Sequence, residues 1–508
     1  MSPSQERTGT TDATTSADST SADSTGAGGL AGGRLGVAGI VFFVISAAAP
    51  LTVLVSGAPL TIRLGGIGAP GAIVACGIVL ILFSCGFTAM SRHVRNAGAF
   101  YAYVTRGLGR STGAGVALTT MSAYALLLLG FYGFIGYFAA ETAEDLLGVD
   151  LPWGVWALAT LALVGLLGFR QVDVGAKVLA VLLTAEVGLL LVLSLAVLAK
   201  GGPEPVSFAS FSPAHVYFAS GAGSLFVLGF GSYIGFEGTA IYAEEAKRPE
   251  RTVPVATYIA IAFLAGFYAF TYWTVIVAFG VEGVVAAAGA DDFGDMLFAM
   301  SGDYLGTSAV VLMRVLIVTS FVACVIAFHN ACARYLFALG REGLLPRALA
   351  RTHRRLKSPY AASHTLTAVA AVAVLLALAA GLDPYLQFGI WTYSSGVVGI
   401  VVAQAVCALS MVAFFGRDRR GHSSSRVLVA PALGALGLIV GVVLIVTNFE
   451  VVTGQTGLAN WLMLLPTPVL FLAGVVLGLL RRGKAPAGDS AGQTLATVPS
   501  ADDSRKRS

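Results

Sequence analysis

The sequence predicts an all-α integral membrane protein with twelve transmembrane helices, arranged as a 5+5 inverted repeat with broken first and sixth helices. Three observations lead to this fold class. The chain has 508 residues, of which 56% are hydrophobic and 11% are charged, whereas soluble domains carry about 25% charged residues. Basic and acidic loops alternate between the apolar segments. Helix-breaking residues interrupt two segments that lie five apart.

The apolar segments are long enough to cross a bilayer, which takes about 20 helical residues. Their approximate limits are 35–60, 66–90, 113–140, 153–169, 176–199, 216–243, 253–280, 308–340, 362–381, 385–415, 427–448 and 459–480. Residues 35–480 are therefore predicted to form one membrane domain. Residues 1–34 and 481–508 are polar and are expected to be disordered tails. No cleaved signal peptide is expected at the N-terminus.

Basic residues gather in alternate loops, and acidic residues occupy the others. The basic set is Arg92, Arg95, Arg106, Arg110, Arg170, Lys177, Lys247, Arg248, Arg251, Arg341, Arg347, Arg351, Arg354, Arg355, Lys357, Arg417, Arg419, Arg420 and Arg426. The opposite set is Glu141, Glu144, Asp145, Asp150, Asp291, Asp292 and Asp295, with Arg63 and Lys200 as its cations. Because cations stay inside, both termini are predicted to be cytoplasmic.

The eighth segment has an arginine near each end. Arg314 and Arg334 are twenty positions apart, or about 30 Å along a helix. We expect their side chains to reach toward opposite membrane faces.

Composition gives no sign of chemistry with metals, cofactors or nucleic acid. The five cysteines have no zinc-binding spacing, so they are expected to be small buried hydrophobic residues. The net charge of +4 is small and gives no reason to expect a nucleic-acid partner. The expected partners are the lipid bilayer and a small solute.

The first and sixth segments contain the predicted breaks. Pro50 follows the small residues Ser46–Ala49, and it lacks an N–H and clashes with the preceding turn. The sixth segment carries Gly229, Gly231 and Gly235, followed by a carboxylate at Glu237. Paired broken helices in an inverted repeat indicate a transport site at the bilayer midplane. The alternative is that Pro50 only kinks a helix and the glycines only aid packing.

Three stretches resemble the amino acid–polyamine–organocation (APC) superfamily of permeases. They are Gly235–Glu237 with Ala243–Pro254, Ala333–Pro346, and Asn96–Tyr101 with Arg106–Gly109. The resemblance covers about residues 35–480. It implies a LeuT-type fold in the plasma membrane and a secondary transporter, a symporter or antiporter, for an amino acid or related amine. The run Ser46–Pro50 departs from the small-Gly pattern of many members.

The breaks predict how a zwitterion would be held. Free N–H groups at a half-helix N-terminus suit a carboxylate, and free carbonyls at a C-terminus suit an ammonium. We expect the carboxylate near Ser46, Ala47, Ala48 and Ala49. The amine is expected near the second break, at Phe230, Gly231, Tyr233 and Gly235.

A side-chain pocket is expected between spans one, three, six, eight and ten. Phe230 is a candidate aromatic gate, with ordinary packing as the alternative. Gly231 stands where several relatives have an aromatic residue, which would leave room for a larger cargo.

Two buried carboxylates have predicted roles. A carboxylate at membrane depth is costly enough to indicate function. Glu237 is expected to couple the broken helix to gating by accepting backbone or hydroxyl hydrogen bonds; a purely structural carboxylate is the alternative. Glu186 is the candidate proton-coupling group, with Thr319 and Ser320 as candidate neighbours, because burial favours a protonated carboxyl. A Glu186 that never titrates is the alternative, and sodium coupling stays open.

Four charged residues follow the sixth segment. Glu244, Glu245, Lys247 and Arg248 are expected either to pair with loop arginines when the inside is shut or to remain solvated. The sequence shows no nucleophile–base pair or metal cluster, so an enzyme is not expected. A polytopic membrane enzyme and a substrate-sensing receptor on the same fold remain as alternatives.

Overall fold

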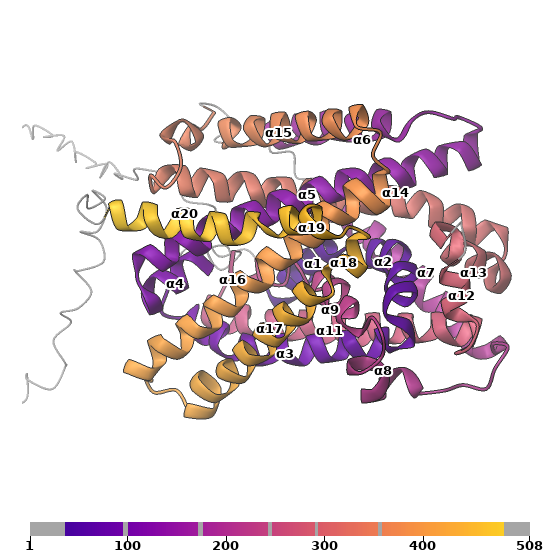
Figure 1. Ribbon diagram of the computed structural model, residues 1–508, viewed down its shortest axis with the longest axis horizontal. Coiled ribbons are helices and arrows are strands. Elements are labelled where there is room, and N and C mark those ends of the chain that lie inside the picture. The colour runs from indigo at the N-terminus through magenta and orange to yellow at the C-terminus, as the bar shows by residue number, and fades with distance from the viewer. Residues whose placement is uncertain are drawn as a thin grey trace, which may run out of the picture.

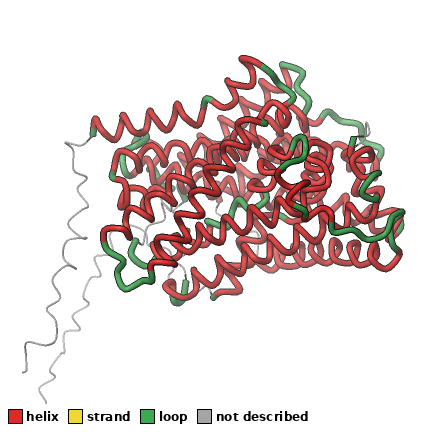
Figure 2. Tube along the Cα trace, turned by 60° about the horizontal axis from the view of Figure 1, so that its bottom comes forward, coloured by secondary structure: helices red, strands yellow, loops and turns green. Residues whose placement is uncertain are grey.

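The computed structural model describes residues 36–94, 100–170, 176–241, 246–289, 293–353 and 358–481. Apart from Arg481, the two predicted tails lie outside these residues. Helices make up nearly all of the described chain, and the loops gather mainly at the ends of the bundle (Figure 2). The predicted all-helical architecture is confirmed.

Each predicted apolar segment coincides with one helix or with an interrupted series of helices. In chain order these are α1 (Val37–Ala48) with α2 (Pro50–Gly65), α3 (Ala69–Met90), α5 (Arg110–Leu147), α6 (Trp153–Arg170), α7 (Ala176–Lys200), α8 (Pro213–Tyr217) with α9 (Ala222–Gly231) and α10 (Gly238–Ile241), α11 (Pro249–Phe279), α14 (Thr307–Arg341), α15 (Tyr360–Ala379), η6 (Pro384–Gly389) with α16 (Ile390–Arg417), η7 (Ser425–Val429) with α17 (Ala430–Thr447), and α19 (Gly457–Leu464) with α20 (Pro466–Leu480). Short helices connect them: α4 (Phe100–Leu108), η1 (Gly66–Gly68), η2 (Ala209–Phe211), α12 (Val284–Ala288), η4 (Phe293–Asp295), α13 (Met296–Leu305), η5 (Arg347–Ala350) and α18 (Phe449–Thr453).

Length and composition qualify eight helices of the described chain as membrane spans, or nine if the bent pair α19–α20 is one span. The first of the eight runs over Val37–Met90, which is 54 residues. At about 1.5 Å per residue it would exceed two bilayer cores, so it contains both the first and the second predicted segment. The helices α6 and α9 are apolar but short. Twelve crossings therefore stay a prediction.

Helices that a five-and-five repeat would make equivalent pack against each other. The pairs are α2 with α9, α3 with α11, and α5 with α14. Figure 1 shows α1, α2 and α9 in the middle of the bundle, enclosed by the longer helices. This packing is compatible with a two-fold relation between the halves, and the repeat itself stays a prediction.

Small residues allow the closest helix contacts, as is common in membranes. The helix α20 crosses α5 at Gly474, where an added Cβ would lie 2.3 Å from the carbonyl oxygen of Ala114. A larger side chain there would push the two helices apart.

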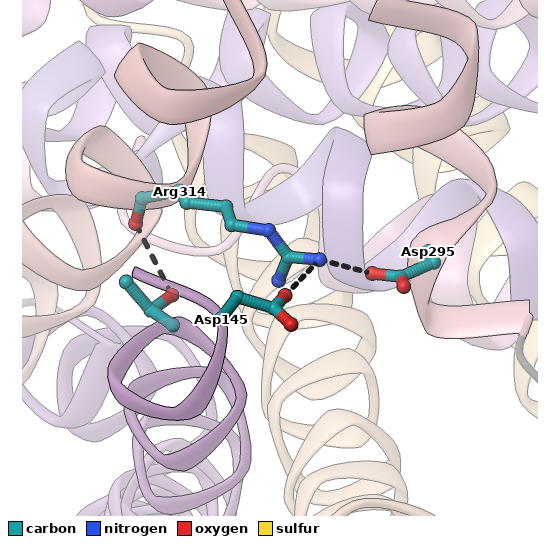
Figure 3. Close-up of polar contacts among 4 residues, drawn as sticks. Asp145, Asp295 and Arg314 are labelled. Atoms are coloured by element: carbon teal, nitrogen blue, oxygen red, sulfur yellow. Dashed lines mark hydrogen bonds and ion pairs between the residues drawn. The ribbon is translucent and has the colours of Figure 1, made fainter. Parts of the chain in front are cut away.

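Arg314 lies near the N-terminal end of α14, where its side chain is buried between carboxylates (Figure 3). Both carboxylates belong to the acidic loops, so the side chain reaches toward its expected end of the span. Its Nη2 forms an ion pair with Asp145, at the end of α5, and lies 2.9 Å from Asp295, just before α13. The guanidinium also sits 4.4 Å from the ring centre of Phe298. This end of the bundle is predicted to be extracellular. Burial is tolerated because both carboxylates compensate the charge.

Candidate functional site

The first break is a single residue wide. The helix α1 ends at Ala48, and Ala49 adopts a left-handed conformation with φ 45° and ψ 75° before Pro50 starts α2. A residue that precedes proline is disfavoured in the right-handed helical region. The N–H of Ala49 still donates to Ile45, at 3.1 Å, and Val53 donates to Ala49, at 3.2 Å. The helical hydrogen bonding therefore continues across this residue with little loss.

The end of α1 presents polar groups to its neighbours. The carbonyl oxygen of Ala48 accepts from the Tyr268 hydroxyl at 3.2 Å, and that of Ala47 lies 3.7 Å from the Cys324 sulfur. The Ser46 hydroxyl is buried and has no hydrogen-bond partner among the described residues. Because this is a helix C-terminus, its free backbone groups are carbonyls. The free N–H groups lie beyond Pro50, on α2.

The second break is six residues long. The helix α9 ends at Gly231, and residues 232–237 form turns before α10 begins at Gly238. Gly235 has φ +114°, a conformation that L side chains rarely adopt. The predicted interruption of the sixth segment is thus confirmed, whereas the first segment is interrupted at Ala49 alone.

Three predicted binding residues at the second break turn toward neighbouring helices. The Tyr233 hydroxyl donates to the carbonyl of Ile73 on α3, at 2.8 Å. The ring of Phe230 packs so closely on Gly441 of α17 that an added Cβ there would lie 2.5 Å from it. At Gly231, an added Cβ would lie 2.3 Å from the Tyr393 hydroxyl, so this tyrosine fills the space expected to accommodate a larger cargo.

Glu237 is buried and is held by two donors. The Tyr124 hydroxyl donates to its Oε1 at 2.5 Å, and the Gly235 N–H donates to its Oε2 at 3.1 Å. The expected hydroxyl and backbone hydrogen bonds to this carboxylate are confirmed. They link the second break to α5.

Glu186 is buried beside the first break. The Ser320 hydroxyl on α14 donates to its Oε2 at 2.9 Å, and the Leu51 N–H of α2 also interacts with this carboxyl. Ser320 is therefore the neighbour that the sequence indicated. Thr319 instead donates to the carbonyl of Leu316, within its own helix.

A cavity lies next to both breaks, between α2, α5, α9, α11, α14 and α16. These include all the helices expected to form the pocket, together with α11. Its described lining is Thr52, Val53, Ser56, Gly57, Phe131, Phe134, Leu228, Ser232, Tyr272, Phe321, Ile390 and Tyr393.

The sequence placed the third segment at the pocket, but it did not identify which residues α5 contributes. Tyr124 holds Glu237, and Phe131 and Phe134 line the cavity. Their spacings of seven and three place them on one helical face. Aromatic residues at helical spacing were therefore a signal in the third segment, although the same pattern also occurs in ordinary cores.

Other predicted contacts are resolved only in part. Glu244 and Glu245 lie outside the described residues, and Lys247 and Arg248 are exposed. Within the described ranges, no cluster of three or more His, Cys, Asp or Glu side chains is placed to hold a metal ion.

Two interrupted helices lie beside a cavity in a bundle of apolar helices, which is the architecture of a multi-pass membrane protein. Residues 39–477 match the model of the amino acid permease family. The chain belongs to this family, within the APC superfamily, so the resemblance noted in the sequence is confirmed.

Known proteins that resemble this chain carry the names of permeases or transporters. It is 28% identical over 262 residues to the uncharacterized amino acid permease YecA of Bacillus subtilis, covering 51% of this chain and 57% of that protein. It is 24% identical to an uncharacterized transporter of Mycobacterium tuberculosis, covering 62% of this chain and 69% of that protein. It is also 24% identical to the methylthioribose transporter of Bacillus subtilis, covering 40% of this chain and 41% of that protein. The chain thus spans a little over half of the first of these relatives.

A solved structure supports the fold. The manganese transporter of Eremococcus coleocola superposes with a TM-score of 0.54 over 87% of this chain and 94% of its own chain. The two sequences are 14% identical, so this similarity concerns the fold alone.

Proposed function

We propose that this protein is a secondary transporter that moves an amino acid or related amine across the plasma membrane by alternating access. In this proposal, residues 35–480 form the transporter domain, which crosses the membrane twelve times with both termini cytoplasmic. The observation that carries it is the pair of interrupted helices, α1–α2 and α9–α10, beside one cavity. Unwound backbone groups are the means by which such folds hold small charged solutes.

The proposed cargo contacts are Ser46, Ala47, Ala48 and Ala49 at the first break. Two features support them. The Ser46 hydroxyl is buried without a partner in the described chain, and the end of α1 offers carbonyls. These carbonyls suit the ammonium group of the cargo, not the carboxylate that the sequence led us to expect there. The second proposed group is Phe230, Gly231, Tyr233 and Gly235, whose backbone forms the end of α9 and the turns after it.

Glu186 is proposed to carry the coupling proton. It bridges α7, the Ser320 hydroxyl of α14 and the backbone of α2. Gain or loss of its proton would change the attraction between these helices, and a ligand shifts a conformational equilibrium only through such a difference. Exchange of one solute for another is the alternative mode, in which no proton is moved.

Glu237 is proposed to transmit movement of the second break to α5 through Tyr124. Phe230, packed on α17, is the proposed aromatic gate. Rearrangement of either contact would change access to the cavity.

Uptake of radiolabelled amino acids and amines into proteoliposomes tests the proposal. We expect saturable uptake that an inward proton gradient stimulates, or that internal cargo stimulates in the case of exchange. Binding without uptake would favour a receptor on the same fold. Release of a covalently altered solute would favour a membrane enzyme.

A further inference from the structure

We infer that the transported solute has an uncharged side group, which the cavity between α2, α5 and α14 receives. This inference rests on the proposed transport function. It adds the chemical class of the cargo and identifies the walls that select it.

The cavity contains no charged side chain among its described lining residues. Its apolar wall consists of aliphatic side chains and of three phenylalanines, Phe131, Phe134 and Phe321. The buried carboxyls near the breaks, Glu186 and Glu237, are not among these lining residues. They are hydrogen-bonded elsewhere, Glu237 to Tyr124 and Gly235, and Glu186 to Ser320. A cationic side group would therefore enter without a counter-ion.

The hydroxyl groups of the lining are largely committed to the protein. Four of them donate to backbone carbonyl oxygens: Thr52 to Ala49 at 2.7 Å, Ser56 to Thr52 at 2.5 Å, Ser232 to Gly229 at 2.7 Å, and Tyr272 to Val53 at 3.3 Å. A hydroxyl has one proton to donate. An anionic side group would thus find few donors, and it would face the negative faces of the aromatic rings.

Aromatic rings can attract cations, which is the main argument against this inference. The ring centres of Phe131 and Phe134 each lie 5.9 Å from that of Tyr393, so several π faces are close together. Cation–π attraction is nevertheless weaker than the cost of removing an unpaired ion from water. The balance favours a neutral aliphatic or aromatic group.

Matched pairs of solutes separate charge from size. Norleucine with lysine, citrulline with arginine, and glutamine with glutamate differ mainly in side-group charge. In competition against a transported reference solute in proteoliposomes, we expect each neutral member to inhibit at concentrations at least tenfold lower than its charged partner. A charged member that competes equally well or better would overturn the inference while leaving transport intact. Absence of uptake and binding for every solute would instead overturn the proposed function.

A charge placed in the wall supplies the second test. In Ser56→Asp the new carboxylate projects from a lining position, and Ser56→Asn is its neutral control. We compare the inhibitory concentration of lysine with that of norleucine in each variant. We expect Ser56→Asp to shift this ratio at least tenfold in favour of lysine relative to Ser56→Asn, because the cation now has a counter-ion. Equal selectivity in two well-folded variants would contradict this role of the wall. Val53→Glu with Val53→Gln repeats the comparison at a neighbouring lining position if Ser56→Asp fails to fold.

Discussion

The two helix breaks are stabilised in different ways. At the first break the carboxyl group comes from another helix: Glu186 of α7 meets the Leu51 N–H of α2 and the Ser320 hydroxyl of α14. At the second break it comes from the break itself, since Glu237 accepts from Gly235 two residues earlier. Each break therefore places a buried carboxyl on a backbone N–H.

The difference indicates that the two carboxyls have different roles. A change in the protonation of a carboxyl that contacts three helices changes its interactions with all of them. A carboxyl that closes its own loop mainly fixes the shape of that loop and passes movement to one partner, Tyr124 of α5. We therefore propose coupling at the first break and gating at the second.

Removal of the carboxyl at the second break should have the largest effect. Glu237→Ala leaves the buried Tyr124 hydroxyl and the partly buried Gly235 N–H without their acceptor, and a buried donor without a partner costs about 1–3 kcal/mol. We expect uptake to be lost and the melting temperature to fall. Glu237→Gln keeps the shape and should retain stability better while slowing uptake at least tenfold. A Glu237→Gln protein with unchanged affinity and rate would rule out the gating role.

At the first break, Glu186→Gln should abolish stimulation by a proton gradient while cargo still binds. Glutamine keeps the size and an acceptor for Ser320, but it cannot exchange a proton. The measurement is uptake with and without an imposed pH gradient, together with equilibrium binding. The neighbouring variant Thr319→Ala is the control, because Thr319 bonds only to its own helix in the contacts observed. Full gradient-driven uptake by Glu186→Gln would exclude this residue as the proton carrier.

Backbone conformation gives a smaller and more local test of the second break. Gly235→Ala should destabilise the protein by about 1–3 kcal/mol, because φ +114° is strained for an L side chain. Space is not the cause, since the added Cβ would lie 3.6 Å from the Cβ of Ala47. Gly238→Ala, at a helical position with open space, should be close to neutral by thermal unfolding. Equal effects of the two substitutions would show that Gly235 is not held in this conformation.

The converse substitution at the first break should have the smallest effect and the opposite sign. Ala49 has φ 45°, a left-handed conformation that costs an L residue about 1–2 kcal/mol. Ala49→Gly removes this cost, partly offset by the greater freedom of glycine in the unfolded chain. We expect a small rise in thermal stability. A marked loss would mean that the Ala49 methyl group packs more strongly than the strain costs.

The sequence by itself determined the membrane class, the helical segments and both points of interruption. These follow from local chemistry: apolar length, the missing N–H of Pro50, the glycines before Glu237, and the cost of a buried carboxylate. Thr319 and Ser320 were both candidate neighbours of Glu186, and Ser320 is the one that meets it.

Only the tertiary structure decided which groups meet. It directs Phe230 and Tyr233 toward α17 and α3, fills the space at Gly231 with Tyr393, and buries Arg314 between two carboxylates. It also brings Tyr124 to Glu237 across 113 positions of sequence. Such contacts depend on how each helix is rotated about its axis, and helices that are hydrophobic on all sides carry little periodic signal to set that rotation. The breaks could therefore be predicted from the sequence, but the walls of the cavity could not.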